Sequence, residues 1–102
     1  MLKKKLGVEV IDREWNYLGD YFKIPSTLII PDGVKRIGSY AFWDCGSLKE
    51  VVIPKSVKLI GICAFDGCNN ATIILKKRKK NFEFIASDAF RGCKHVKEEV
   101  RS

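Results

Sequence analysis

The sequence has little of what most enzymes and metal sites require. Among its 102 residues it has one histidine, His95, and it has no glycine-rich phosphate loop, no Gly-x-Ser-x-Gly and no His-Glu-x-x-His. The acidic pair Glu98 and Glu99 is adjacent near the C-terminus, which is a poor arrangement for acid–base catalysis by two carboxylates. We therefore expect no catalytic residue, no cofactor and no enzyme activity.

No apolar run approaches the roughly 18 residues that a membrane-spanning helix needs. The basic start, residues 1–6, is similar to that of a signal peptide, but Glu9 and Asp12 interrupt the apolar segment that would have to follow. We therefore expect a cytoplasmic protein that does not use a membrane as its partner.

The four cysteines lack the spacing of a zinc site. The closest pair is Cys63 and Cys68, whereas zinc sites usually contain Cys-x-x-Cys pairs, and His95 is remote in the sequence. Because a reducing cytoplasm keeps thiols free, we expect neither a disulfide nor a bound metal.

Charge is abundant and one-sided. The chain carries 19 Lys and Arg against 12 Asp and Glu, a net charge of +7, and six of the seven excess charges lie in residues 51–102. With 46% hydrophobic and 30% charged residues, the composition is that of a folded globular chain. The basic surface favours an anionic partner, which leaves nucleic acid, an acidic protein face and a nucleoprotein complex open.

An internal repeat is the strongest pattern in the sequence. Residues 28–45, LIIPDGVKRIGSYAFWDC, are followed 23 residues later by residues 51–68, VVIPKSVKLIGICAFDGC. A third copy matches at an offset of 25, so we expect two inserted residues, which the basic run 76–80 accommodates. A period in this range is typical of stacked coils that bury their apolar side chains against one another.

The repeat spacing, Ile-Pro…Val-x-x-Ile-Gly-x-x-Ala-Phe-x-x-Cys-x-x-Leu, resembles the BspA-like class of leucine-rich repeats over residues 24–96. The resemblance implies a parallel sheet on one face of the solenoid and a role in binding proteins. The third copy departs from the pattern, with Lys77 where Pro54 predicts proline, Ala71 where Leu48 stood, and Ala86 in place of Gly61.

We therefore predict an α/β fold that forms one solenoid domain over residues 1–102. Residues 1–23 are expected to cap the first coil, residues 24–96 to form about three repeats, and residues 97–102 to form the C-terminal end.

Each coil should contain a strand, a loop and a short helix. Strands are expected at 27–30 and 50–53, where apolar and β-branched residues end at a proline. Residues 39–44 and 62–67 are expected to form single turns of helix. Gly61 and its equivalent Gly38 indicate a turn or a close backbone approach. Equivalent core residues should stack as an aromatic ladder of Phe42, Phe65 and Phe90 and a thiol ladder of Cys45, Cys68 and Cys93.

An apolar column on the outside of the strands is the first candidate binding site. Alternation along each strand turns Ile29 and Val52 outward, and Leu75 joins them if the 23-residue register persists. An open apolar column usually has a cover. The aromatic segment 1–22, a protein partner and a second copy of the chain all remain open as that cover.

Two further candidates come from positions where one repeat differs from the others. Trp43 has Asp66 and Arg91 as its repeat equivalents, which places a tryptophan at a solvent position and suggests a binding anchor. Packing against the cap or a neighbouring coil is the alternative. The basic run is the third candidate, and it could be a solvated loop or a patch that binds phosphates. It consists of Lys76, Lys77, Arg78, Lys79 and Lys80, and the patch could extend to Arg91, Lys94 and Lys97.

Two functions remain open, and we favour the first. The first is a non-catalytic module that binds a protein through the sheet face and Trp43. The second is a basic protein that binds nucleic acid or a nucleoprotein, for example a small mobile-element inhibitor of a host defence complex of the CRISPR type.

Overall fold

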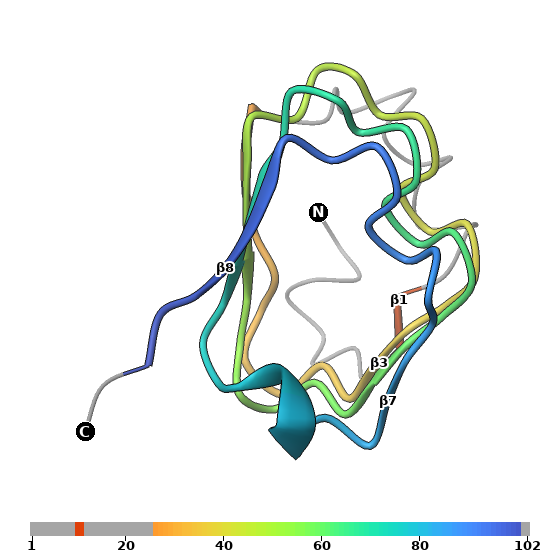
Figure 1. Cartoon of the computed structure of the whole chain (residues 1–102). Helices are drawn as coiled ribbons and strands as arrows, with labels where there is room; N and C mark the ends of the chain where they lie inside the picture. The colour runs from red at the N-terminus through yellow and green to blue at the C-terminus, as the bar shows by residue number, and fades with distance from the viewer. Residues whose placement is uncertain (1–9, 12–25, 101–102) are drawn as a thin grey trace.

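The computed structural model describes residues 10–11 and 26–100. Seen along its axis, the chain winds in successive coils that lie on top of one another (Figure 1). The predicted cap, apart from residues 10–11, lies outside the described residues. Within the part that the structure describes, no helix is long and apolar enough to cross a membrane.

Two parallel sheets form opposite walls of the coil (Figure 1). The long sheet has the order β2-β4-β6-β8, with β2 Thr27–Ile29, β4 Glu50–Ile53, β6 Thr72–Leu75 and β8 His95–Glu98. The short sheet has the order β1-β3-β5-β7, with β1 Val10–Ile11, β3 Arg36–Ile37, β5 Leu59–Ile60 and β7 Phe84–Ile85. The strands expected at 27–30 and 50–53 are confirmed, whereas the sequence predicted only one of the two sheets.

The predicted helical turns at 39–44 and 62–67 are wrong, and with them the α/β class. Both segments are non-helical turns, and the one helix among the described residues is the short 3₁₀ element η1, Lys79–Asn81. The backbone amides of Tyr40 and Phe42 donate to the carbonyls of Ile62 and Ala64 in the next coil, at 2.9 and 2.8 Å. Since these amides bond between coils, they do not form the i to i−4 bonds of an α-helix.

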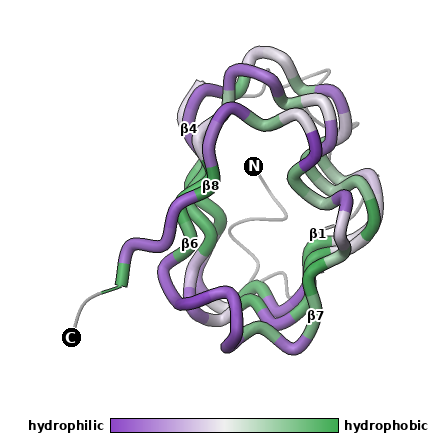
Figure 2. The backbone as a smooth tube through the Cα atoms, viewed as in Figure 1, coloured by the Kyte–Doolittle hydropathy of each residue, from purple (hydrophilic) through white to green (hydrophobic). Residues whose placement is uncertain are grey.

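The core lies between the two sheets and consists of equivalent residues stacked from coil to coil. The Phe42 and Phe65 rings stack at a centroid distance of 5.2 Å, and Phe65 and Phe90 stack at 5.8 Å, which confirms the aromatic ladder. The thiols stack as well, because Cys68 and Cys93 donate to the carbonyls of Phe42 and Phe65 at 3.1 and 3.2 Å. Figure 2 shows the apolar residues concentrated along both sheets and the polar residues in the turns.

The third coil follows a different register from the predicted one. Ile53 pairs with Leu75, an offset of 22 residues, whereas Ile60 pairs with Ile85, an offset of 25. One residue is therefore missing before β6, and three residues, not two, are inserted between β6 and β7. Lys76, and not Lys77, occupies the position after the strand where Pro54 stands, since its amide donates to the carbonyl of Ile53 at 3.0 Å.

Candidate interaction surfaces

The outer face of the long sheet carries a column of apolar residues. Ile29 pairs with Val52 and Val52 with Ile74, so these three residues form the apolar stripe. Ile29 is 65% exposed, Val52 is half-buried and Ile74 is buried. Lys97 is the next residue in the column and ends the stripe with a cation. The stripe is therefore open to solvent at the β2 side and closed toward β6.

Leu75 was predicted to belong to this column, and that prediction is wrong. Leu75 pairs with Ile53, faces the interior and is fully buried. The missing residue before β6 shifts this strand by one position, and a shift of one residue turns every side chain to the other face of a sheet. Ile74 takes the outward position that the 23-residue spacing assigned to Leu75.

Trp43 lies in a turn, six residues after the end of β3, and is 45% exposed. The edge of its ring faces Tyr40, with ring centroids 6.2 Å apart at an angle of 77°. Ile62, 51% exposed, is bonded through its carbonyl to the Tyr40 amide of the neighbouring coil. We call Tyr40, Trp43 and Ile62 the aromatic corner. It belongs to the turns that follow the strands of the short sheet, whereas the apolar stripe lies on the long sheet.

Asp66 and Arg91 occupy the positions equivalent to Trp43 in the second and third coils. The Arg91 guanidinium donates to both Asp66 carboxylate oxygens, at 2.8 and 3.1 Å, and the Trp43 indole is a further hydrogen-bond partner of this carboxylate. The hydrogen bonds from Arg91 hold the pKa of Asp66 below its ordinary value, against the opposing effect of desolvation. The Asp66 carboxylate thus interacts with both of its repeat equivalents, strongly with the Arg91 guanidinium and less with the Trp43 indole.

The basic run is partly neutralised by the C-terminal strand. The Lys76 ammonium lies 2.6 Å from the Glu99 carboxylate, and the backbone amide of Lys79 donates to Glu98 at 2.8 Å. The Lys77 ammonium lies 4.6 Å from the centre of the Phe82 ring, and partial burial lowers the pKa of Lys77. Only part of the run therefore presents unpaired charge to a partner.

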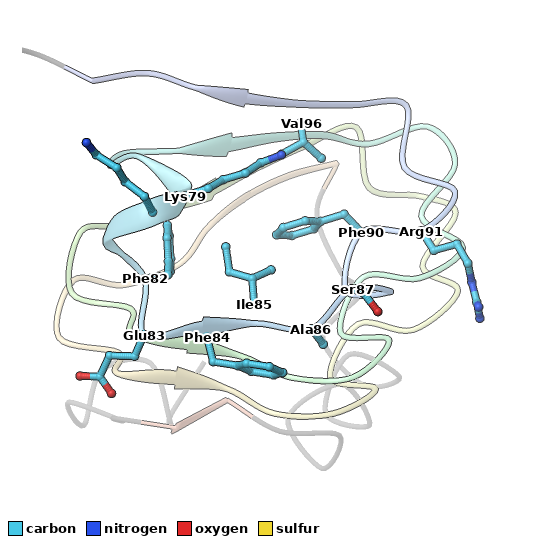
Figure 3. Close-up of a pocket in the computed structure, with 11 residues that line it drawn as sticks. Lys79, Phe82, Glu83, Phe84, Ile85, Ala86, Ser87, Phe90, Arg91 and Val96 are labelled. Carbon is cyan, nitrogen blue, oxygen red and sulfur yellow. The ribbon is translucent and has the colours of Figure 1, made fainter.

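The residues predicted to extend this patch, Arg91, Lys94 and Lys97, lie in or beside β8 or in the turn before it. Lys94 precedes β8 and its amide bonds to Ala71, whereas Lys76 lies beside Glu99 at the opposite end of that strand. Arg91 is engaged with Asp66 on the side of the aromatic corner, and Figure 3 shows it far from Lys79. The cations are therefore distributed around the coil, and their binding of phosphate stays a prediction.

The chemistry of the thiols is that of core residues. Burial raises the pKa of Cys93 to about 11, and burial also raises the pKa of Cys63, which hydrogen-bonds to Asp88 at 3.5 Å. A raised pKa disfavours the thiolate, which is the form that attacks electrophiles and binds metals. No group of three potential metal ligands occurs among residues 10–11 and 26–100.

Among the exposed apolar residues that escaped the sequence reasoning are Tyr40, Ile62 and Phe84, which is 55% exposed. Each of them could have been found by comparing equivalent positions between repeats. Ile62 stands where the other copies have Ser39 and Ser87, and Phe84 pairs with Leu59, which pairs with Arg36. An apolar residue at a position that is polar in another copy marks a surface patch.

Coils of about 23 residues, wound into two parallel sheets around stacked core residues, define a leucine-rich-repeat solenoid. The family described as BspA type leucine rich repeat region, in six copies, matches residues 21–100. The chain belongs to this family, as the resemblance of its repeats implied. No curated protein and no solved structure shows a significant match to the chain. Leucine-rich repeats commonly mediate contacts between proteins and are generally not enzymes.

Proposed function

We propose that this chain is a non-catalytic module that binds a protein partner through the apolar stripe on the long sheet, with the aromatic corner as a second, separate contact. The observation that carries the proposal is Ile29, whose side chain is 65% exposed on the face of a regular strand. A branched apolar side chain in that position gains free energy only when another surface covers it.

The surroundings of the stripe fit a protein better than a nucleic acid. Beside it runs a second outward column of polar residues, in which Thr27 pairs with Glu50 and Thr72 with His95. An apolar centre with a polar margin is the usual composition of a protein interface. Glu50 also places a negative charge next to the stripe, which is unfavourable for a phosphate backbone.

Replacement of Ile29 by glutamate tests the proposal. Ile29→Glu should leave the melting temperature nearly unchanged, because the side chain is exposed, but should weaken partner binding at least about tenfold, which is about 1.4 kcal/mol. The partner is first isolated from the native cell extract with the parent chain, after nuclease treatment, and its dissociation constant is then measured against each variant. Val52→Glu should give the same loss of binding.

Lys55→Glu is the control, because it places the same glutamate at an exposed position in the turn after β4 and makes the net charge more negative by two units, where Ile29→Glu changes it by one. The control should retain the affinity of the parent. Equal affinities of Ile29→Glu, Val52→Glu and the parent would exclude the stripe as the binding site, and a parallel loss in Trp43→Ala alone would assign binding to the aromatic corner.

A further inference from the structure

The excess positive charge of the chain lies along one edge of the solenoid. Three turns lead from the long sheet to the short sheet, at residues 31–35, 54–58 and 76–83, and they lie together at the bottom of the view in Figure 1. These turns contain eight Lys and Arg residues against Asp32 and Glu83, which accounts for six of the seven excess charges of the chain. Glu98 and Glu99 reach this edge from β8 and leave it an excess of four. We call these three turns the basic edge.

Backbone hydrogen bonds hold the three turns in register. The Lys58 amide donates to the carbonyl of Lys35 at 2.7 Å, and the Glu83 amide donates to the carbonyl of Lys58 at 2.9 Å. The Gly33 amide donates to the Ser56 hydroxyl of the next turn at 3.0 Å. Neighbouring turns therefore lie one strand spacing apart, about 4.8 Å. The cations of the basic edge thus stand on a regular framework and not on a single free loop.

The cations of the basic edge have little opposing charge beside them. Burial, and to a lesser degree the charge of Lys58, lowers the pKa of Lys77, so these two cations lie close enough to repel each other. The Glu83 carboxylate lies 4.0 Å from the Lys58 ammonium, and both side chains are more than half exposed. An exposed ion pair of this kind contributes little to stability. A bound anion would relieve the repulsion between Lys58 and Lys77.

An exposed aromatic ring borders the basic edge. Phe84 directly follows the third turn as the first residue of β7, and its side chain is 55% exposed. Figure 3 shows Ile85 on the inner side of β7 and Phe84 on the other side. The neighbour of Phe84 in the sheet is Leu59, which is half-buried and follows Lys58. A flat apolar surface therefore lies beside the cations, on the outer face of the short sheet.

The combination of cations with an exposed aromatic ring distinguishes between anionic partners. In sites for single-stranded nucleic acids, the cations contact the phosphates and the unpaired bases stack on aromatic side chains. An acidic peptide would account for the cations of the basic edge but not for the ring of Phe84. A duplex would also account only for the cations, because its bases are stacked on one another.

We propose that the basic edge binds the phosphates of a single-stranded nucleic acid, one base of which stacks on Phe84. Stacking on a phenylalanine tolerates any base, so the site reads no particular sequence. This site does not depend on the proposed binding of a protein, since the apolar stripe lies on the outer face of the long sheet. Loss of one activity would leave the other intact.

Fluorescence anisotropy with two labelled probes tests the proposal. The probes are oligo(dT) and oligo(U) of about 12 nucleotides, a length within the usual site sizes. The parent chain should bind at low salt, and the logarithm of its association constant should fall with the logarithm of the salt concentration by about 0.7 per phosphate contact. Binding of either probe supports the proposal, and the tighter probe identifies DNA or RNA. A parent chain that binds neither probe at low salt overturns it.

Two triple variants that remove the same charge test the position of the site. The first removes exposed lysines of the basic edge, Lys35→Ser, Lys55→Ser and Lys58→Ser. The second removes exposed lysines that lie before or within strands of the long sheet, Lys49→Ser, Lys94→Ser and Lys97→Ser. The first variant should lose affinity at least about tenfold, because it loses phosphate contacts, and the second less than about threefold.

Equal losses in the two triple variants would show that only the net charge matters and would overturn the proposal. Circular dichroism melts check that both variants fold like the parent. If the fold of the first variant is altered, a second variant of the same edge replaces it, with serine at Arg78, Lys79 and Lys80.

Variants of Phe84 separate a single-stranded nucleic acid from other polyanions. Phe84→Ala should weaken the binding of the oligonucleotide at least about fivefold, because a stacked base is lost, and should leave the salt dependence unchanged, because no cation is removed. Phe84→Trp should retain the affinity of the parent. A poly-glutamate peptide and a DNA duplex of the same length should bind more weakly and respond to neither variant. Poly-glutamate that binds as tightly as the oligonucleotide, with no effect of Phe84→Ala on either, would assign the basic edge to an acidic protein segment and refute the proposal.

Discussion

The second and third coils contain the same core residues in different surroundings. Phe65 lies between two aromatic rings and is fully buried, whereas Phe90 stacks on Phe65 alone and is partly exposed. Cys68 and Cys93 differ in the same way, one buried and the other half-buried. In a solenoid the contribution of a residue therefore depends on whether a coil lies on both sides of it, and not on its identity alone.

The largest expected difference between the two coils comes from truncation of the aromatic ladder. Phe65→Ala removes the middle ring and should cost roughly 3 to 5 kcal/mol of unfolding free energy, because the cavity is closed on both sides. Phe90→Ala should cost clearly less, because solvent already reaches its ring. Urea unfolding of both variants measures the two losses. Equal losses would show that the end of the solenoid is as well packed as its middle.

The aromatic ladder could be predicted because the repeat places equivalent residues at a fixed offset, and stacking follows from that offset. The conformation of residues 39–44 and 62–67, which were expected to be helical, could not be predicted correctly. Their local composition permits a helical turn, but the amides of Tyr40 and Phe42 bond to the next coil, which no window of local sequence contains. The position of Leu75 was missed for a related reason, since the missing residue before β6 is hidden by the longer insertion that follows it.

The candidate surfaces could be predicted in part. Ile29 and Val52 face outward as alternation required, and Trp43 is exposed where its equivalents are charged. The pairing of Lys76 with Glu99 was missed because these residues are 23 positions apart, the length of one coil, and meet only when β8 is placed beside β6. Their roles in binding remain predictions.

Substitution of Gly61 is expected to have the next largest effect on the unfolding free energy. A Cβ at this position would lie 2.7 Å from the amide nitrogen of Ser39, in the backbone of the coil before it. Gly61→Ala should therefore separate the first two coils locally and cost about 1 to 3 kcal/mol, as overpacked cores do. At Gly46 the nearest atom would be 4.0 Å away, so Gly46→Ala should stay within about 0.5 kcal/mol of the parent. Thermal melts of the two alanine variants give this contrast directly.

Alkaline pH should weaken the third coil through its thiol. Burial raises the pKa of Cys93 to about 11, above the ordinary value of 9.0, so the folded state favours the neutral thiol. The stability that the neutral Cys93 thiol contributes is complete below about pH 9 and is lost as the pH rises toward 11. Urea unfolding at pH 7, 9 and 11, under reducing conditions, should show a steeper decline for the parent than for Cys93→Ala. Parallel declines would show that other groups alone cause the loss.

The smallest expected effect on stability concerns the inserted loop, which has no counterpart in the second coil. Arg78, Lys79 and Lys80 are exposed, and the bond from Lys79 to Glu98 uses the backbone amide. Their replacement by serine should therefore change the unfolding free energy by less than about 0.5 kcal/mol. Lys77→Ser is the matched comparison. It removes the cation from the Phe82 ring and should cost about 0.5 to 1 kcal/mol, although it removes only one charge.

The same triple serine variant separates the two functions that the sequence left open. A partner held through the apolar stripe should bind the variant with nearly the parent affinity and associate more slowly, because remote charge steers the encounter more than it holds the complex. A nucleic acid held by this loop should lose affinity, and the salt dependence of its binding should fall by about 0.7 to 0.9 per lost phosphate contact. The dissociation constant at two salt concentrations, for parent and variant, distinguishes these outcomes. An unchanged affinity together with an unchanged salt dependence would mean that the insertion only returns the chain from β6 to β7 and that binding lies elsewhere on the solenoid.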